Sequence, residues 1–466
     1  MKLLLPTAAF MAVVHAGTVS LDMVRRQNTE NIGLYSRQHA RHLEETPQKV
    51  TLLVDTGSTD TFVLTTNGTC AREDANCLTP YDPDQSSTLT RATPDELTDD
   101  DFYATFVDKT FAKGKYAKDD FTVGDVTLAQ QIIGVADTSN TTEGILGLAF
   151  DDLEVSNERK TGAERYPSFL TKMAATGAIS RRVFSMSLGA ASGNLRFGGI
   201  DTERFYEDLA KIPITERHFE DDGTPGSYSI LLDDFTAKGI SPEIAPFRRG
   251  QVAILDSGTT DTVLPRLQAV AIANALGAVG NKNYTGSGNN GLVDCKRRNE
   301  NVTLEFVLGG KKLYIPIANF IADEEFSKDK LNNMDDAARA FSKICTLRIS
   351  SAENVDGLYF GDSFLRSVYV VHDVDNKIIG LAQANLQSTK SNVIEIGAKD
   401  PIPNAKGAAL PDQVVKTGRD GPQKNTSDKT SAADNMLHVP TVAFAVVVAA
   451  ILLASKGPAC VLRALE

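Results

Sequence analysis

The pattern of apolar and polar residues separates a long central body from an apolar run at each end of the 466-residue chain. The first run lies in MKLLLPTAAFMAVVHAG, where one Lys precedes the apolar residues and Val14-His15-Ala16 offers small residues for cleavage. This pattern predicts a secretory signal peptide over residues 1–16, because the run is too short to span a membrane. A buried first strand is the alternative. Residues 17–45 are polar and basic, with a dibasic Arg25-Arg26 pair, and predict a pro-segment or a disordered N-terminal arm.

The second apolar run, Val439–Ala454, follows a polar stretch over residues 386–438. That stretch cannot bury enough apolar surface to fold, so it predicts a disordered stalk. Residues 439–466 are interpreted as an anchor signal or a membrane segment. The run of about 16 residues is short for a spanning helix and matches the tail of a glycolipid-anchor signal, with small residues such as Ser427, Ser431, Ala432 and Ala433 upstream. The charged residues after the run, with Lys456 and Arg463, favour a single membrane span instead. Burial of the run as a core strand is the third alternative.

Within the body, local patterns are typical of β structure. Apolar residues alternate with period two from Phe102 to Gly114, which predicts a hairpin strand. We expect another strand at Leu209–Ile214 and short helices at Ser168–Thr176 and Arg266–Leu276. The 35 glycines suit a turn-rich β protein better than a helical bundle.

An internal repeat is the main functional clue. Leu53-Val54-Asp55-Thr56-Gly57-Ser58-Thr59-Asp60-Thr61-Phe62-Val63 matches Ile254-Leu255-Asp256-Ser257-Gly258-Thr259-Thr260-Asp261-Thr262-Val263-Leu264. The copies lie about 200 residues apart, which excludes a short-period solenoid and indicates a duplicated domain. Each copy is a strand that runs into a glycine turn, with an Asp at the strand end and hydroxyls beside it. An Asx turn in each copy is the structural alternative.

Two such carboxyl groups brought together would hold one proton between them, because neighbouring like charges cannot both ionise cheaply. One would then act as a general base for water and the other as a general acid for a carbonyl group. The repeat therefore predicts that Asp55 and Asp256 form a catalytic pair.

Composition excludes several other functions. A hydrophobic content of 42% and a charged content of 23% are ordinary for a globular protein. The net charge of −12 argues against a nucleic-acid partner. The six His residues lack metal-ligand spacing apart from His39 and His42, which we interpret as part of a solvated segment, so we expect no metal and no cofactor. The chain has no G-x-S-x-G, H-E-x-x-H or G-x-x-x-x-G-K motif for a serine hydrolase, a zinc protease or a nucleotide-binding protein.

Secretion permits disulfides, and four cysteines lie in the body. Four cysteines allow three connectivities, and proximity favours Cys70–Cys77 and Cys295–Cys345. Sequons for N-glycosylation occur at five candidate surface positions, Asn67, Asn140, Asn283, Asn301 and Asn425.

The chain resembles the pepsin-type aspartic endopeptidases over about residues 43 to 385, and most resembles their surface-anchored fungal members, the yapsins. The resemblance rests on the two Asp-x-Gly loops, the turn Tyr81-Asp82-Pro83-Asp84-Gln85-Ser86-Ser87-Thr88, the segments Gly144-Ile145-Leu146-Gly147-Leu148 and Leu358-Tyr359-Phe360-Gly361-Asp362, and the cysteine positions. It implies a mostly β fold with two pseudo-symmetric lobes around a cleft, which we place at residues 46–205 and 206–385. It also implies a supporting set around the catalytic pair, namely Thr56, Gly57, Ser58, Ser257, Gly258 and Thr259.

The family's flap hairpin, which covers the substrate, aligns with the Phe102–Gly114 strand and implies that Phe106, Val107 and Asp108 bind substrate. Here the chain departs from the family, which has Tyr-Gly at the flap tip where this chain has Phe106-Val107, and commonly Trp where this chain has Phe62. Phe cannot donate the tyrosine's hydrogen bond.

The resemblance therefore implies an endopeptidase that cuts polypeptides at acidic pH, works as a monomer and reaches the cell surface, held at the membrane by its C-terminal anchor. The alternative is a surface-anchored pepsin-like protein that binds polypeptide or cell-wall ligand without cutting, which the altered flap favours. An acidic cleft that prefers basic residues beside the scissile bond, as in the yapsins, is a further hypothesis.

Overall fold

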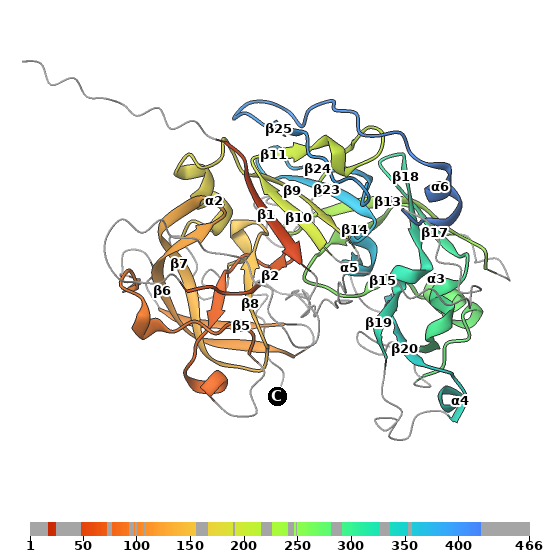
Figure 1. Cartoon of the computed structure of the whole chain (residues 1–466), viewed down its shortest axis with the longest axis horizontal. Coiled ribbons are helices and arrows are strands. Elements are labelled where there is room, and N and C mark those ends of the chain that lie inside the picture. Colours follow the sequence, from red (N-terminus) through yellow and green to blue (C-terminus); the bar gives the residue numbers. More distant parts are fainter. Residues whose placement is uncertain are drawn as a thin grey trace, which may run out of the picture.

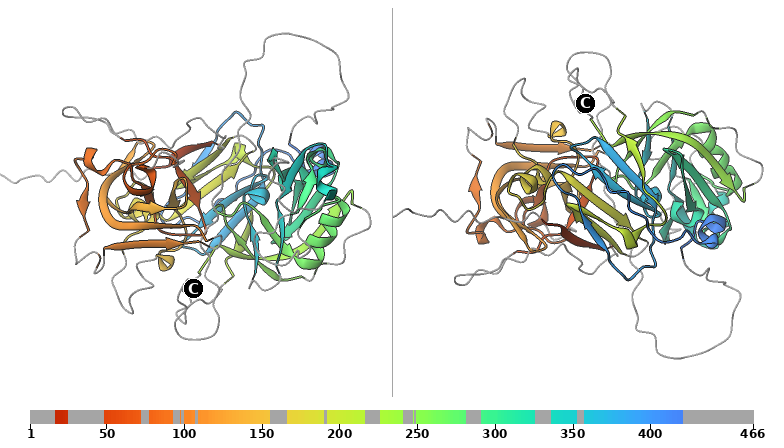
Figure 2. Two further views of the ribbon diagram at one scale, coloured as in Figure 1. Left: turned by 90° about the horizontal axis from the view of Figure 1, so that it is seen from below. Right: turned by 90° about the horizontal axis from the view of Figure 1, so that it is seen from above.

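The computed structural model describes residues 17–24, 48–71, 77–92, 97, 100–106, 109–154, 166–189, 192–215, 226–240, 247, 249–280, 291–325, 336–352 and 357–420. Within them, two β lobes flank a central sheet, with the N-terminal lobe in orange and the C-terminal lobe in green in Figure 1. Both views in Figure 2 place the yellow and light-blue strands of the central sheet between the lobes. The expectation of a mostly β, pepsin-like fold is confirmed.

Each lobe is built on a seven-stranded sheet. The order in the N-terminal lobe is β2 (Leu52–Asp55), β8 (Gly144–Gly147), β3 (Phe62–Leu64), β7 (Val126–Ser139), β6 (Phe111–Val123) and β4 (Thr90–Arg91), with β5 (Asp101–Thr105) paired to β6. The order in the C-terminal lobe is β18 (Lys311–Pro316), β17 (Thr303–Leu308), β13 (Ser229–Lys238), β14 (Gln251–Leu255), β22 (Leu358–Phe360), β15 (Thr262–Pro265) and β21 (Ile349–Ala352). A small sheet beside it contains β16 (Leu292–Asp294), β20 (Ile344–Leu347) and β19 (Ile321–Glu325).

The two lobes repeat one strand arrangement around the duplicated motif. Strand β2 pairs in parallel with β8, which pairs antiparallel with β3. Strand β14 pairs in parallel with β22, which pairs antiparallel with β15. Strands β8 and β22 are buried along their whole length, as expected for short apolar runs inside a sheet.

The central sheet joins the lobes and has six strands. Their order is β1 (Val19–Val24), β10 (Ser192–Phe197), β9 (Val183–Leu188), β23 (Val368–Asp373), β24 (Ile378–Gln383) and β12 (Ala210–Pro213). Beside it, β11 (Gly199–Asp201) pairs with β25 (Val393–Glu395). The strand predicted at Leu209–Ile214 is confirmed as β12. The main hydrophobic core runs through the central sheet and both lobes.

Among the described residues, helices are few and short. They are α2 (Phe169–Ala175), α3 (Arg266–Ala275), α4 (Asp336–Arg339), α5 (Asp362–Leu365) and α6 (Asp412–Thr417), and the 3-10 turns are η1 (Gly68–Ala71), η2 (Pro83–Gln85), η3 (Asp151–Leu153), η4 (Thr202–Arg204), η5 (Cys295–Asn299) and η6 (Ile317–Phe320). The helices predicted at Ser168–Thr176 and Arg266–Leu276 are confirmed as α2 and α3. Ser168 caps α2 by accepting a hydrogen bond from the backbone N–H of Thr171.

The N-terminal segment differs from the expected disordered arm. The sequence predicts an arm or pro-segment over residues 17–45, but Val19–Val24 pair antiparallel with β10 at the edge of the central sheet. Val19, Leu21 and Met23 are buried, while Ser20 and Asp22 between them are exposed. This period-two alternation stabilises an edge strand, so the interpretation of an arm is wrong for these six residues. Residues 25–45 lie outside the described residues.

The expectation of a disordered stalk from residue 386 is also wrong for its first part, residues 386–420. Residues 386–420 wrap along the outside of the fold, from β25 to α6, as the dark-blue segment at the top of Figure 1 shows. Ile396, Ile402 and Val414 are buried against the body. Asp420 closes the segment by accepting hydrogen bonds from the backbone N–H of Leu386 at 2.5 Å and from the Tyr206 hydroxyl at 2.7 Å. We call residues 386–420 the C-terminal strap.

None of the helices in the described ranges is long and apolar enough to cross a membrane. The two apolar runs, residues 1–16 and 439–454, lie outside those ranges, as does the remainder of the predicted stalk.

Candidate active site

Asp55 and Asp256 lie at corresponding places in the two lobes. Asp55 is the last residue of β2, and Asp256 follows the last residue of β14. Both side chains are fully buried. The carbonyl oxygen of Asp55 accepts from the N–H of Leu148 at 2.8 Å, and the N–H of Asp256 donates to the carbonyl oxygen of Phe360 at 3.2 Å. The strand behind each loop therefore holds the backbone on which the carboxyl group is mounted.

Two glycines let those strands approach the loops closely. A Cβ on Gly147 would lie 2.3 Å from the carbonyl carbon of Thr59, and a Cβ on Gly361 would lie 2.3 Å from the carbonyl oxygen of Thr259. Any side chain at either position would push the strand away from the loop. This contact explains the apolar-apolar-Gly pattern in both halves of the sequence.

The two loops are joined to each other by four hydrogen bonds. The N–H of Thr56 donates to Ser257 Oγ at 3.1 Å, and the N–H of Ser257 donates to Thr56 Oγ1 at 2.9 Å. The Thr56 hydroxyl donates to the carbonyl oxygen of Leu255 at 3.0 Å, and the Ser257 hydroxyl donates to that of Val54 at 2.8 Å. Each hydroxyl thus binds a backbone carbonyl of the strand that carries the opposite aspartate. These bonds to the backbone fix how far apart the two carboxyl groups lie.

Each carboxyl group receives matching hydrogen bonds from its own loop. Asp55 Oδ1 accepts from the N–H of Gly57 at 2.7 Å, and its Oδ2 accepts from the hydroxyl of Ser58. Asp256 Oδ1 accepts from the N–H of Gly258 at 2.9 Å, and its Oδ2 accepts from the hydroxyl of Thr259 at 2.6 Å. The loops therefore place all the predicted supporting residues around the two aspartates.

Burial changes the titration of the pair. Desolvation and the neighbouring charge of Asp256 raise the pKa of Asp55 to about 8. Burial also raises the pKa of Asp256, against the hydrogen bonds that it accepts. Because the two groups interact, they titrate as a pair. A pair that holds one proton can both donate and accept a proton.

The flap aligned from the sequence is a β5–β6 hairpin. Its turn is closed by the N–H of Lys109, which donates to the carbonyl oxygen of Phe106 at 2.8 Å. Phe106 is only 6% exposed and packs toward Phe62, with ring centres 6.3 Å apart. Val107 and Asp108 lie outside the described residues.

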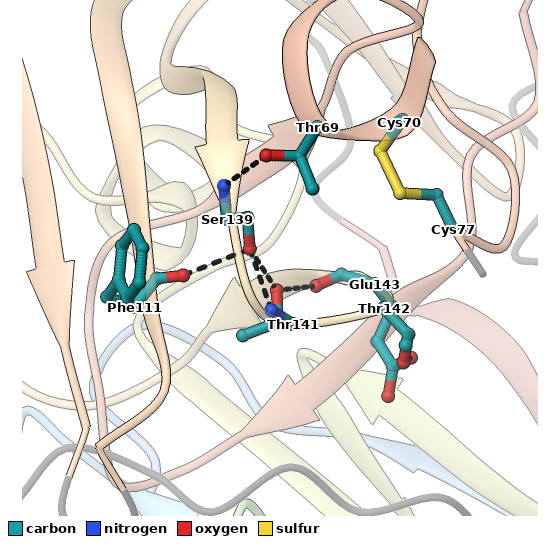
Figure 3. Close-up of a disulfide and its surroundings, with 8 residues drawn as sticks. All are labelled: Thr69, Cys70, Cys77, Phe111, Ser139, Thr141, Thr142 and Glu143. Carbon is teal, nitrogen blue, oxygen red and sulfur yellow. Dashed lines mark hydrogen bonds between the residues drawn. A yellow bond between two sulfur atoms is a disulfide. The ribbon is translucent and has the colours of Figure 1, made fainter. Parts of the chain in front are cut away.

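The return strand of the flap is tied to a disulfide loop, as Figure 3 shows. The Ser139 hydroxyl donates to the carbonyl oxygen of Phe111 at 3.0 Å, and the N–H of Ser139 donates to the hydroxyl oxygen of Thr69 at 3.0 Å. Thr69 adjoins Cys70, which is bonded to Cys77. The Cys295–Cys345 bond is also present, so both expected pairings are confirmed.

Three of the sequon asparagines, Asn67, Asn140 and Asn301, are exposed. Asn283 and Asn425 lie outside the described residues. Asn140 also braces the flap, because its Oδ1 accepts from the N–H of Phe111 at 2.6 Å.

The sequence does not predict a role for three residues beside the site, Asp60, Tyr116 and Tyr166. Asp60 lies in the repeat and is buried, and the hydroxyls of Tyr116 and Tyr166 both donate to its Oδ1 at 2.6 Å. The signal for Asp60 was its presence in both copies of the repeat. The tyrosines gave no local signal, because they come from distant segments of the chain.

Comparisons with known proteins agree with this geometry and confirm the resemblance seen in the sequence. The family model for eukaryotic aspartyl proteases matches residues 43–384. A probable aspartic-type endopeptidase OPSB of Arthroderma benhamiae is 29% identical over 373 residues, which cover 78% of this chain and 71% of that protein. Aspartic proteinase yapsin-3 of Saccharomyces cerevisiae is 27% identical, over 77% of this chain and 67% of that protein. Secreted aspartic protease 4 of Candida albicans is 29% identical, over 75% and 76% respectively.

Proposed function

Since the chain belongs to the eukaryotic aspartyl protease family and is an aspartic-type endopeptidase, we propose that Asp55 and Asp256 are the pair that hydrolyses its peptide substrates. The observation that carries this proposal is the burial of two facing carboxyl groups on loops that bind each other through Thr56 and Ser257. No metal or organic cofactor is required, because water is the nucleophile.

The reaction needs the pair in its singly protonated state. The ionised carboxylate takes a proton from water as the hydroxyl oxygen bonds to the carbonyl carbon of the substrate, and the protonated carboxyl gives its proton to the carbonyl oxygen. The tetrahedral diol then collapses: one of its hydroxyl groups gives its proton to the ionised carboxylate as the C=O bond re-forms, the amide nitrogen takes the proton of the other carboxyl group, and the C–N bond breaks. The pair returns to one proton. The raised pKa of Asp55 keeps that proton in place at the acidic pH at which we expect the enzyme to work.

The remaining groups of the site support this reaction. Gly57, Ser58, Gly258 and Thr259 orient the carboxyl oxygens, and the β5–β6 hairpin, with Phe106 at its turn, covers the bound peptide.

One assay tests the assignment of the catalytic pair. Digestion of a peptide library at acidic pH should give cuts that a statine-type transition-state analogue blocks. Asp55→Asn and Asp256→Asn should each lose at least about 100-fold in kcat, since each removes one member of an acid–base pair. Asp125→Asn, in the exposed turn between β6 and β7, is the matched control and should keep full activity. Full activity of either aspartate variant would overturn the assignment.

We also propose that the chain enters the secretory pathway through residues 1–16 and is held at the cell surface by a glycolipid, attached at one of the small residues Ser427, Ser431, Ala432 or Ala433 when the part of the chain after it, with the apolar run, is removed. Glycans would occupy the exposed sequons. Phosphatidylinositol-specific phospholipase should release the protein from intact membranes. If detergent alone releases it, and an antibody to the residues after Lys456 still detects it, the tail spans the membrane instead.

A further inference from the structure

The second aspartate of the repeat has no part in the proposed reaction, and its two copies lie in different surroundings. Asp60 is 4% exposed and accepts hydrogen bonds from two phenols. Its counterpart Asp261 is half-buried and faces the guanidinium group of Arg348 at 3.7 Å. The pseudo-symmetry that holds for Asp55 and Asp256 is therefore broken at this position.

The phenols that bind Asp60 belong to the flap side of the N-terminal lobe. Tyr116 is on β6, the return strand of the hairpin, and Tyr166 comes just before α2. The two rings lie 5.6 Å apart, and both residues are buried. A buried tyrosine hydroxyl needs an acceptor, and Asp60 Oδ1 supplies one to both.

Tyr116 also belongs to the aromatic packing under the flap. The ring of Tyr116 meets Phe102 of β5 edge to face at 5.2 Å, and Phe102 packs on Phe62 at 5.3 Å. Phe62 lies two residues after Asp60 and faces Phe106 at the flap turn. A small hydrophobic core, separate from the main one, contains these four aromatic residues. Both strands of the hairpin thus rest on the segment Asp60–Phe62, which continues the Asp55 loop.

We propose that Asp60 is a positioning residue that holds the flap hairpin in register with the Asp55 loop through its two phenol hydrogen bonds. This inference rests on the proposed function, because it assumes that the hairpin closes over peptide bound at the aspartate pair. Phe106 at the flap turn has no hydroxyl, and Ser139 and Asn140 bind the hairpin through its backbone, so the side-chain hydrogen bonds to Asp60 hold the flap at its base. Asp60 touches neither substrate nor the reacting groups and acts through Tyr116 and Tyr166.

Four variants separate this role from simple stabilisation. Asp60→Leu removes the acceptor, Tyr116→Phe and Tyr166→Phe each remove one donor, and Asp60→Asn keeps an acceptor oxygen without the charge. The matched control is Tyr81→Phe, which removes a phenol–carboxylate hydrogen bond of 2.7 Å to Asp119, a residue of β6 beyond the part that pairs with β5. The measurements are kcat and KM per active site titrated with a statine-type inhibitor, the Tm, and hydrogen exchange of the amides in residues 100–106 and 109–116.

Asp60→Leu and Tyr116→Phe should lower kcat/KM by about 10- to 100-fold, mainly through KM, and speed exchange in the hairpin. Asp60→Asn should stay within about threefold of the wild type, because one amide oxygen can accept both phenols. Tyr81→Phe should lower the Tm alone. The proposal is overturned if Asp60→Leu and Tyr116→Phe behave like Tyr81→Phe, or if Asp60→Asn is as impaired as Asp60→Leu. If Asp60→Leu does not fold, the two tyrosine variants decide. Failure of the proposed function would appear separately, as full activity of Asp55→Asn.

Discussion

Thr56 and Ser257 each donate a backbone N–H to the other's hydroxyl oxygen, at 3.1 and 2.9 Å, and so join the two lobes at the aspartate pair. The exchange is reciprocal because the two loops are copies of one motif that face each other. Neither residue is charged, and both are buried. The spacing of the carboxyl groups therefore depends on neutral hydrogen bonds that do not change with pH.

Removal of one of these hydroxyls should weaken both fold and catalysis. Ser257→Ala leaves the N–H of Thr56 without its acceptor and the carbonyl oxygen of Val54 without its donor. We expect the free energy of unfolding to fall by about 1–3 kcal/mol and kcat to fall more than KM changes, because the pair loses its alignment. Ser257→Thr keeps the hydroxyl and is the control. Urea unfolding and steady-state kinetics on both variants check this, and an unchanged kcat in Ser257→Ala would contradict it.

The raised pKa of Asp55 predicts that the protein loses stability as the pH rises. Burial and Asp256 raise this pKa to about 8 in the folded protein, whereas an Asp in an unfolded chain titrates near 3.9. Between these values the folded state binds more protons, so the stabilisation is complete below about pH 4 and is lost as the pH approaches 8. Asp55→Asn cannot ionise, so its Tm should exceed that of the wild type by a margin that grows from pH 4 to pH 8. A margin that shrinks over this range would contradict the assignment.

His372 should have the opposite effect. It lies fully buried in β23, stacked on Phe184 at 4.4 Å, and burial lowers its pKa to about 3. An unfolded His titrates near 6.5, so the unfolded state binds more protons between pH 6.5 and 3, and stability falls as the pH falls through this range. His372→Leu should therefore gain stability relative to the wild type by up to about 3 kcal/mol on going from pH 7 to pH 4. Comparison of the two pH values in chemical denaturation cancels the pH-independent cost of repacking, and a constant difference would disprove the effect.

The C-terminal strap should be needed for folding, unlike the chain after it. The strap buries Ile396, Ile402 and Val414, each worth about 1.5–3 kcal/mol, and the carbonyl oxygen of Asp400 accepts from Arg181 at 2.8 Å. A chain that ends at Gln387 should have a much lower Tm or fail to accumulate as soluble protein. A chain that ends at Asp420 should melt like the longer protein without its apolar tail. Equal Tm values for the two truncations would show that the strap contributes nothing.

Local patterns in the sequence are sufficient to predict several elements of this structure. The alternation at Phe102–Gly114 found a hairpin strand, and Ser168 marked the start of α2. The pairing of Cys70 with Cys77 followed from their proximity in the chain. The sequence does not predict the strap, because its buried residues, such as Ile396 and Val414, are isolated among polar ones and follow no period. It does not predict β1 either, because the alternation at Val19–Val24 is short and basic residues follow it.

The chemistry of the proposed site is encoded locally, because the duplicated Asp-x-Gly motif carries its carboxyl groups, turns and hydroxyls within a few adjacent residues. Which groups meet across the chain depends on the fold. Asp55 and Asp256 become one titrating pair because two distant loops bind each other through Thr56 and Ser257. Asp60 receives phenols from two separate segments for the same reason. Such contacts depend on how strands stack and which surfaces become buried, and no local pattern of residues encodes them.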